Sequence, residues 1–305
     1  MSLSKFEYIK YVQFSLEDKE TRAFKKEYDS KMIEVLKAFV DICDTHDLRY
    51  VLGYGSVLGA VRHSGIIPWD DDIDVCMPRP DYEEFKKICN DEDVGNYEIY
   101  CIEKGNNYIE PYIKFADKNS SLIYNANIPY VCGVMIDIFP IDGADSDENL
   151  WKHYSDKYNY LHRIHQVILI PHSLKSLWNL TKEGGWRHSL VAIITTPFKK
   201  RLHRYIQKEM NRIERHCPYN NSEMVAFYHR VYGYKERIPK NWVEDRIKHQ
   251  FESIEVFIPK DYEKYLTHFY GDYMQIPPIE ERDKHLIAYI NLHKRESIDE
   301  IKEKL

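Results

Sequence analysis

Residues 49–77 read RYVLGYGSVLGAVRHSGIIPWDDDIDVCM, and this stretch decides the fold that the rest of the chain completes. Residues 49–52 predict a strand, which a Gly-Tyr-Gly turn interrupts before a short helix over residues 56–62. Gly55 lets the backbone approach an anion closely, Ser56 can donate its hydroxyl, and the first turn of a helix presents unpaired N–H groups. The turn is therefore a candidate phosphate-binding site.

A cluster of aspartates follows the short helix. Residues 70–75 read DDDIDV, so that acidic and apolar side chains alternate. On a strand, Asp72 and Asp74 point to one face, while Ile73 and Val75 pack into a core on the other. Two carboxylates on one face are half of a magnesium site that substrate phosphates complete. The stretch as a whole indicates phosphate chemistry.

Three other interpretations of this stretch compete with phosphate chemistry. A dinucleotide-binding turn does not fit, because the helix is too short for a crossover and such a site needs a single ribose-binding acid. A calcium loop starting at Asp70 would place Val75 where glycine is required and Asp81 where glutamate is required. A solvated acidic turn stays open, although Ile73 and Val75 alternate with the acids as in a half-buried strand.

A further acid lies within an apolar stretch, because residues 134–143 read VMIDIFPIDG. A lone carboxylate in such a strand is costly unless something pairs with it, and a metal shared with Asp72 and Asp74 is the simplest partner for Asp137. The alternative, an aspartate that caps a turn at the end of the strand, suits Asp142 better than Asp137.

Hydrophobic periodicity and turn residues outline the other elements. They predict helices over residues 26–46 and 80–88, strands over 97–102, 112–115, 121–124 and 250–259, and a helix over 261–270 that ends at Gly271. After residue 145 the sequence predicts helices near 147–165, 173–181, 187–196 and 199–216, and we expect His162 and His165 to lie on a helix surface rather than to bind zinc. Tryptophan and basic residues within 165–205 favour contact with an anionic membrane surface, whereas the simpler interpretation is a helical cap over the active-site sheet, and the two are compatible.

Composition excludes several classes of protein. The chain has 305 residues, 43% of them hydrophobic, and a formal charge of −6, which does not suggest a nucleic-acid partner. Its six cysteines are scattered singly, as in a reducing compartment. No apolar signal segment and no run of eighteen apolar residues occurs. We therefore expect a cytoplasmic protein, with attachment to the inner face of the membrane as a further expectation.

Several of these motifs together resemble the LicD family of phosphotransferases, which is similar in turn to the wider nucleotidyltransferase-fold superfamily. The motifs are GSVLGAVRH at 55–63, IPWDDDIDV at 67–75, IDIFP at 136–140 and YGDYM at 270–274. The resemblance covers roughly residues 30–142 and 242–288, and residues 146–240 match only loosely.

The resemblance implies an α/β (α+β) fold, with a nucleotidyltransferase-like mixed β-sheet core flanked by helices and a helical insertion or cap. Residues 1–145 are then the catalytic core, residues 146–240 the insertion or cap, and residues 241–305 the segment that completes the catalytic domain.

The activity implied is magnesium-dependent transfer of phosphocholine from CDP-choline to a sugar hydroxyl, with release of CMP. The acceptor is a glycan or lipid-linked glycan, such as a teichoic acid or lipopolysaccharide precursor. Two alternatives remain. One is transfer of ribitol or glycerol phosphate from its CDP-activated donor, and the other is a non-catalytic module that binds nucleotide or glycan.

Carried over residue by residue, the resemblance makes Asp72, Asp74 and Asp137 the catalytic and metal-binding residues, with Asp137 as ligand or as base for the acceptor hydroxyl. Two Mg²⁺ ions are expected, with Mn²⁺ as the alternative metal. The residues expected to bind substrate or phosphate are Gly55, Ser56, Arg62, His63, Trp69, Tyr112, Lys114, Arg282 and His285. An ordinary surface ion pair is the alternative for Arg62 and Lys114. A choline cage would draw on Tyr54, Trp69, Tyr112 or Tyr130.

Overall fold

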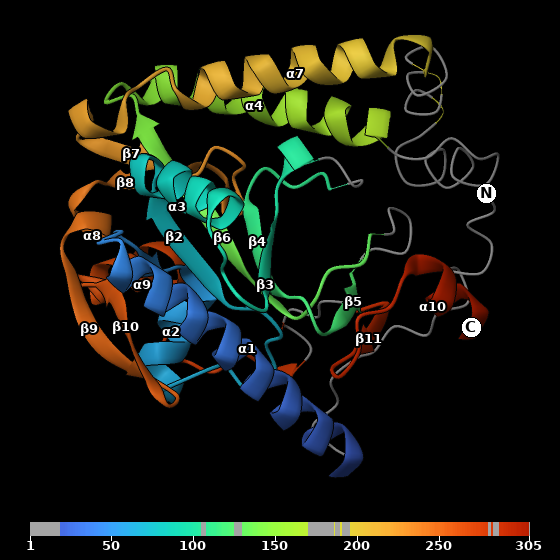
Figure 1. Cartoon of the computed structure of the whole chain (residues 1–305). Coiled ribbons are helices and arrows are strands. Elements are labelled where there is room, and N and C mark those ends of the chain that lie inside the picture. Colours follow the sequence, from blue (N-terminus) through green and yellow to red (C-terminus); the bar gives the residue numbers. More distant parts are fainter. Residues whose placement is uncertain are drawn as a thin grey trace.

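A mixed β-sheet is the centre of the computed structural model, which describes residues 19–104, 108–124, 130–169, 186, 190, 196–279, 282 and 287–304 (Figure 1). Its strands run in the order β1-β2-β6-β4-β3, and β7 and β8 extend it from β6. The β2 and β6 strands are parallel, and the other neighbours are antiparallel. The strands are β1 (Val51–Leu52), β2 (Asp74–Pro78), β3 (Tyr97–Tyr100), β4 (Ile113–Asp117), β6 (Met135–Ala144), β7 (Met224–Ala226) and β8 (Ile238–Pro239).

Helices surround this sheet, which confirms the predicted fold class. In Figure 1, α1 and α3 cover one face, and α4 and α7 lie side by side across one end. Two small antiparallel pairs, β9 with β10 and β5 with β11, complete the described part. The other α-helices and strands are α1 (Lys19–Thr45), α2 (Tyr54–His63), α3 (Arg79–Asp91), β5 (Ser121–Ile123), α4 (Glu148–Leu169), α7 (Lys199–Glu214), α8 (Asn241–Glu244), β9 (Arg246–Phe251), β10 (Ile254–Pro259), α9 (Tyr262–Tyr270), β11 (Tyr289–Asn291) and α10 (Ile298–Lys304).

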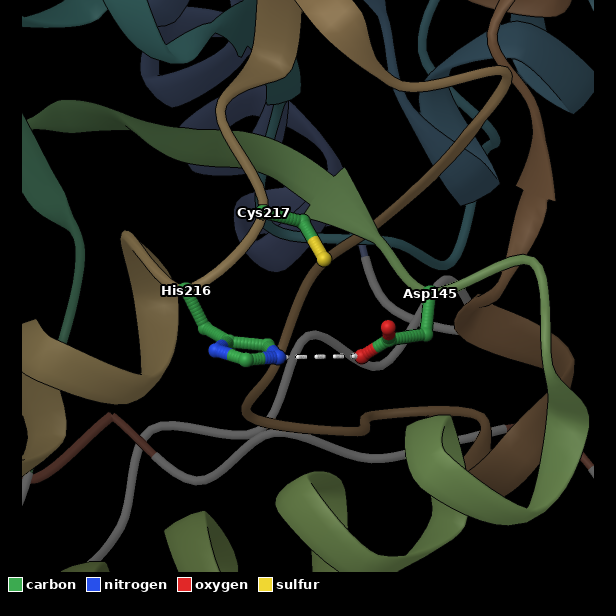
Figure 2. Close-up of side chains that lie close together, drawn as sticks. All are labelled: Asp145, His216 and Cys217. Carbon is green, nitrogen blue, oxygen red and sulfur yellow. Dashed lines mark ion pairs between the residues drawn. The ribbon is translucent and has the colours of Figure 1, made fainter.

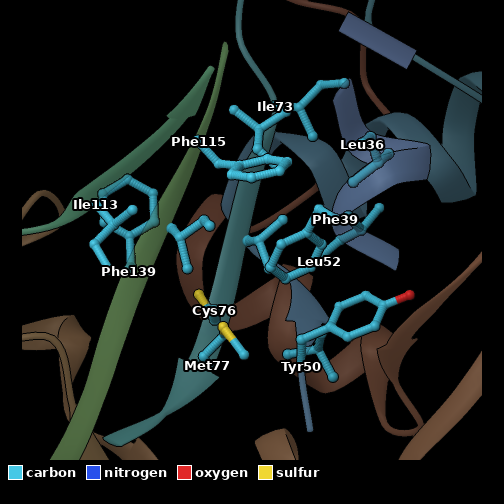
Figure 3. Packing of buried hydrophobic residues seen from close by; sticks show 14 of the residues in the cluster. Leu36, Phe39, Tyr50, Leu52, Ile73, Cys76, Met77, Ile113, Phe115 and Phe139 are labelled. Atoms are coloured by element: carbon cyan, nitrogen blue, oxygen red, sulfur yellow. The ribbon is translucent and has the colours of Figure 1, made fainter. Parts of the chain in front are cut away.

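The main core lies between the sheet and the helices α1 and α3. Ile73 and Val75 are completely buried, as the alternation with the aspartates predicted. Aromatic rings link the layers, since the Phe39 ring of α1 lies 5.1 Å from that of Phe85 on α3, and Phe85 lies 5.5 Å from Phe115 on β4. Figure 3 shows Phe39 and Phe115 within this core. Because side chains alternate along a strand, this packing on one face directs the neighbouring residues of β2, β4 and β6 to the other.

The predicted elements are mostly confirmed, with two changes around the aspartates. The helix α2 begins at Tyr54 instead of residue 56, and β2 begins at Asp74 instead of residue 70. The reason is that β1 pairs with β2 only as far as Leu52, opposite Val75, and the chain then turns away through Gly53. Asp72 therefore precedes the strand instead of lying within it.

The single strand predicted over residues 250–259 is also wrong, because this stretch contains a turn. The backbone of Glu252 has a φ of 50°, in the left-handed region, and it joins β9 to β10. The Glu252 carboxylate accepts a hydrogen bond from the N–H of Ile66, 3.2 Å away, so the turn also contacts the loop after α2.

A second apolar cluster joins α4 and α7 to the sheet. It includes Trp151 and Tyr158 of α4, Met210 of α7 and Tyr228 after β7, all at most 4% exposed. His162 and His165 are also buried, at 2% and 0% exposure, so the expectation that they lie on a helix surface was wrong. The α4 face that carries them is covered by residues from distant parts of the chain, which helical periodicity alone cannot reveal.

Some expectations for residues 146–240 stay untested. The predicted helices near 173–181 and 187–196 lie largely outside the described residues, as does most of the predicted membrane-contact segment 165–205. Among the described helices, none combines the length and the apolar character needed to cross a membrane. The division into three parts also stays a prediction, and β7 and β8 bring strands from the middle part into the sheet.

A buried ion-pair network attaches the α4 and α7 pair to α3 and β6. The Arg79 guanidinium donates to both oxygens of Asp142, at 2.7 and 2.6 Å, and lies 3.3 Å from Glu214 of α7. The Tyr158 hydroxyl of α4 donates to Glu214 at 2.7 Å. Burial disfavours the charged guanidinium, but Asp142 and Glu214 outweigh that effect and raise the pKa of Arg79. Asp142 is thus a partner in a core ion pair and not a turn cap.

Arg79→Met is expected to destabilise the protein by about 3–5 kcal/mol, because it leaves Asp142 as a buried charge without its main partner. The measurement is the free energy of unfolding from urea titration. Arg215→Met is the matched control, since the Arg215 side chain is 62% exposed and its ion pair with Glu83 contributes at most about 1 kcal/mol. If the two substitutions lowered the free energy of unfolding equally, the buried network would contribute no more to stability than an exposed ion pair.

Candidate active site

An open cleft of about 490 Å³ lies on the face of the sheet opposite α1 and α3. Its lining comes from α2, the aspartate stretch, β6, the loop after β7 and the segment after α9. The lining residues are Tyr54, Gly55, Leu58, Arg62, Ile67, Trp69, Asp70, Asp72, Asp74, Tyr112, Asp137, Phe139, His229, Val231, Tyr232, Tyr270, Asp272, Tyr273, Gln275, Pro277 and Arg282. The cleft thus brings together most of the site residues that the sequence predicted.

Three charged residues stand in one row across the sheet beneath this cleft. Asp74 of β2 is paired in register with Asp137 of β6, and Asp137 is paired with Lys114 of β4. Residues directly opposite each other on adjacent strands share a face, so all three project on the side of the cleft. The strand register, and not a loop, fixes their relative positions.

Lys114 is the direct partner of Asp137. Its ammonium lies 2.6 and 2.9 Å from the two carboxylate oxygens, and both residues are buried. Burial by itself disfavours the ammonium, but Asp137 outweighs that effect, and the pKa of Lys114 is raised. The sequence predicted a metal as the partner of the buried Asp137, which stays a prediction, and the structure adds Lys114 as a partner that the sequence did not reveal. Lys114 is therefore neither a surface ion pair nor part of the cleft lining.

The carboxylates of Asp70, Asp72, Asp74 and Asp137 line the cleft and form its acidic floor. Asp70 and Asp72 come from the stretch before β2. Carboxylate oxygens of Asp70, Asp71 and Asp72 lie within 4.8 Å of one another, whereas the predicted trio does not form such a group among the described residues. Burial raises the pKa of Asp72, and the negative charges of Asp74, Asp70, Asp71 and Asp137 raise it further. A divalent cation would relieve this repulsion. The floor therefore has the oxygen ligands and the charge that such an ion requires.

The Gly-Tyr-Gly turn is bound to the start of β2. The Gly53 N–H donates to the Asp74 carbonyl oxygen at 2.8 Å, and the Asp74 N–H donates to Ser56 Oγ at 2.8 Å. Ser56 is buried and does not line the cleft, so it positions Asp74 in this structure instead of facing a ligand. Gly55 does line the cleft, and a Cβ there would lie 3.2 Å from Asp70 Oδ2, so glycine gives this carboxylate its room.

Arg62, Trp69 and Arg282 also line the cleft, and they form a basic and aromatic wall beside the acidic floor. The Arg282 guanidinium lies 4.0 Å from the centre of the Trp69 ring, and that of Arg62 lies 5.8 Å from it. Arg62 donates to the Tyr273 carbonyl oxygen at 2.7 Å, so it is not in a surface ion pair but holds the segment after α9. Burial lowers the pKa of Arg62, and the charge of Arg282 lowers it further, which an anionic ligand would offset.

Two predicted binding residues occupy different positions from the rest. His63 is not among the residues that line the cleft; its ring centre lies 5.7 Å from that of Trp69, and its Nε2 accepts a hydrogen bond from Arg62. His285 lies outside the described residues, so its placement stays a prediction. Of the four candidates for a choline cage, Tyr130 packs against Tyr100 and Tyr108 and is not among the residues that line the cleft.

The structure adds cleft residues that sequence reasoning missed. Tyr270, Asp272 and Tyr273 belong to a motif at 270–274 that had been noted but given no role. His229 and Tyr232 come from the stretch after β7, where no sequence signal pointed to the site. Pairing of β7 with β6 brings that stretch to the cleft, and such long-range pairing could not be read from a single sequence.

A buried glutamate supports the aromatic side of the cleft. Glu236 accepts hydrogen bonds from the Tyr54 hydroxyl at 2.7 Å and from the Tyr232 N–H at 2.8 Å. Burial raises the pKa of Glu236 to about 7. The backbone of Tyr54 has a φ of 40°, in the left-handed region that costs free energy for a non-glycine residue, and these contacts hold it there.

Stability is expected to fall between about pH 4.5 and pH 7, because the unfolded chain ionises Glu236 in this window while the folded protein keeps it protonated. In Glu236→Gln, the loss of unfolding free energy across this pH window should be smaller by about 3 kcal/mol. The measurement is urea unfolding of both proteins at pH 5 and pH 8. If the unfolding free energy of wild type and variant changed with pH in the same way, the assignment to Glu236 would be wrong. The control is Glu244→Gln, at a more exposed carboxylate.

Comparisons with known proteins agree with this geometry. Residues 47–173 match the sequence profile described as LicD/FKTN/FKRP, nucleotidyltransferase domain. The chain is 28% identical over 268 residues to the lipopolysaccharide cholinephosphotransferase LicD of Haemophilus influenzae, a similarity that covers 85% of this chain and 95% of that protein. An uncharacterized protein of Rickettsia typhi is 38% identical over 69 residues, which cover 21% of this chain and 22% of that protein. The acidic floor and the Gly-Tyr-Gly turn both lie within residues 47–173, the part of the chain that matches the LicD/FKTN/FKRP nucleotidyltransferase domain.

Proposed function

We propose that this protein transfers phosphocholine from CDP-choline to a sugar hydroxyl of a lipopolysaccharide-type glycan and releases CMP. The observation that carries the proposal is the single cleft in which the Asp70, Asp72, Asp74 and Asp137 carboxylates face the Arg62 and Arg282 side chains. The similarity over most of the chain to a lipopolysaccharide cholinephosphotransferase supports the choice of phosphocholine as the group transferred.

The acidic floor fits a divalent metal, and Asp72, Asp74 and Asp137 are the proposed ligands for Mg²⁺. When bound, Mg²⁺ supplies positive charge that offsets the charge developing on the phosphates and on the departing CMP. The fit rests on hard oxygen ligands and on the mutual repulsion that raises the pKa of Asp72. Ser56 and Gly53 hold the backbone of Asp74 through their hydrogen bonds, which keeps its carboxylate aimed at the cleft.

The basic wall is the proposed site for the donor phosphates. Guanidinium groups suit phosphate because their planar donors bind two oxygens at once. Arg62 is already oriented by its bonds to the Tyr273 and Gln275 carbonyl oxygens, at 2.7 and 3.3 Å, so little side-chain freedom is lost when an anion binds. Binding would also relieve the repulsion between Arg62 and Arg282.

Aromatic faces in the cleft suit the choline cation. Quaternary ammonium groups bind to tyrosine and tryptophan rings with about 0.5–2 kcal/mol for each contact. Arg282 already covers a face of Trp69, and the Lys114 ammonium lies 5.2 Å from the centre of the Tyr112 ring, which leaves Tyr232 and Tyr270 as the better candidates in the lining. The Tyr232 ring is held by stacking on Tyr54, with ring centres 5.3 Å apart.

The transfer itself needs an attacking hydroxyl and a group to take its proton. The acceptor oxygen forms a bond to the choline-bearing phosphorus, the bond from that phosphorus to the CMP oxygen breaks, and CMP leaves. Asp137 is the proposed proton acceptor or metal ligand, and the Lys114 ammonium lies 2.6 Å from its buried carboxylate. The same ion pair fixes the carboxylate in place, because both partners lie on adjacent strands.

The proposed donor is tested by CMP release from CDP-choline, CDP-ribitol and CDP-glycerol, each with Mg²⁺ and with EDTA. The acceptors are a lipopolysaccharide core fragment and a teichoic-acid fragment. Turnover of CDP-choline with the lipopolysaccharide fragment, lost in EDTA, is the expected result. Turnover of a polyol donor instead would overturn the choline assignment, and turnover that persists in EDTA would overturn the metal assignment.

Asp74→Asn is expected to lower kcat/KM by at least about a thousandfold, a loss of about 4 kcal/mol of transition-state stabilisation. The amide keeps the size of the side chain but removes the negative charge that a metal needs. The control is Asp81→Asn, at a buried aspartate of α3 that pairs with Arg49 away from the cleft, and it should keep most of the activity. Activity of the Asp74 variant close to that of the control would rule out a role for Asp74 in metal binding.

A further inference from the structure

A second cluster of side chains that can bind a metal lies at the opposite end of β6 from Asp137. Asp145 follows the last residue of β6, and His216 and Cys217 follow α7 (Figure 2). One carboxylate oxygen, one imidazole nitrogen and the thiol sulfur lie within 4.8 Å of one another. Figure 2 shows that the three side chains point into a common space from two separate segments of the chain. None of them lines the candidate active site.

We propose that Asp145, His216 and Cys217 bind one zinc ion through Asp145 Oδ2, His216 Nε2 and Cys217 Sγ. Water would occupy the fourth position, since His216 is 38% exposed and solvent can reach the site.

The distance between His216 and Asp145 favours a metal between them over a direct hydrogen bond. His216 Nε2 and Asp145 Oδ2 are 3.6 Å apart, which is longer than a direct hydrogen bond. Two ligands of a tetrahedral zinc ion, with bonds of about 2.0–2.2 Å, lie about 3.4 Å apart. Asp145 Oδ2 is also a buried atom for which no hydrogen-bond partner is found among the described residues. A cation between these groups would satisfy that oxygen.

The surrounding contacts hold the ligands in place without using their metal-binding atoms. Gly143 and Cys217 form a backbone bridge, and a Cβ on Gly143 would lie 2.4 Å from the Cys217 carbonyl oxygen, so only glycine permits this approach. The Tyr154 ring lies 4.1 Å from the ring of His216. Arg237 donates to the backbone oxygen of Asp145 at 2.8 Å and not to its carboxylate. The ligands are therefore preorganised.

The ligand types select the kind of metal. One thiolate and one imidazole favour zinc and similar borderline ions over Mg²⁺, which prefers oxygen ligands. A nucleophilic role for Cys217 is disfavoured, because burial and the charge of Asp145 raise the pKa of its thiol to about 11. Binding of Zn²⁺ replaces the thiol proton with a zinc–sulfur bond and releases that proton to water. The site would join the end of α7 to the strand that carries Asp137.

The test is titration of the reduced full-length protein with Co²⁺, which reports a cobalt–thiolate bond by its near-ultraviolet absorption. Excess Mg²⁺ is present to occupy the acidic floor, which contains no thiol. We expect one Co²⁺ per chain with the thiolate band, and displacement of that Co²⁺ by Zn²⁺. Cys217→Ser should abolish the band, while His216→Gln and Asp145→Asn should weaken Zn²⁺ binding at least about a hundredfold. Cys89→Ser, at a buried cysteine of α3, is the matched control and should bind as the wild type does.

Zinc should also raise the melting temperature of the wild type and of Cys89→Ser, but not that of Cys217→Ser. This readout does not depend on catalytic activity. The absence of a thiolate band in the wild type, or a band that persists in Cys217→Ser, would overturn the proposed site. Failure of Zn²⁺ to displace Co²⁺ would overturn the choice of zinc.

Discussion

The row of Asp74, Asp137 and Lys114 across three neighbouring strands is the constraint on which the rest of the site depends. Two acids and a lysine are placed on one face of a sheet whose other face is an apolar core. A buried carboxylate is tolerated because an ammonium lies 2.6 Å from it. If the register slipped by one residue, all three charges would enter the core, so the hydrophobic packing and the position of the site specify each other.

The walls of the cleft come from segments far apart in the sequence. The short helix α2 returns the chain from β1 to the aspartates, and its Arg62 binds the carbonyl oxygens of Tyr273 and Gln275, more than two hundred residues later. On the aromatic side, Tyr54 reaches Glu236 and stacks on Tyr232, with ring centres 5.3 Å apart. These contacts place a cationic wall opposite an acidic floor, an arrangement that suits the donor and the metal of the proposed reaction.

Local pattern predicted the parts of this site that depend on neighbouring residues. The alternation of Ile73 and Val75 with the acids, and the single acid in an apolar strand at Asp137, correctly indicated side chains at one face of a sheet. Sequence reasoning could not identify Lys114 as the partner of Asp137, because that pairing depends on the β4 and β6 register. It likewise missed His229 and Tyr232, and it placed His162 and His165 on a surface, because long-range packing determines their burial. The start of β2 was misjudged since strand pairing, and not propensity, determines where a strand begins.

The proposed function requires the acidic floor to hold the metal used in phosphoryl transfer. This is tested by the anomalous scattering of Mn²⁺ in crystals of the protein grown with CDP-choline. We expect a manganese peak in the cleft bonded to Asp72 and Asp74, with the donor phosphates between that peak and the Arg62 side chain. A bound donor with no manganese at the aspartates, or manganese bound only elsewhere on the chain, would contradict the proposed function.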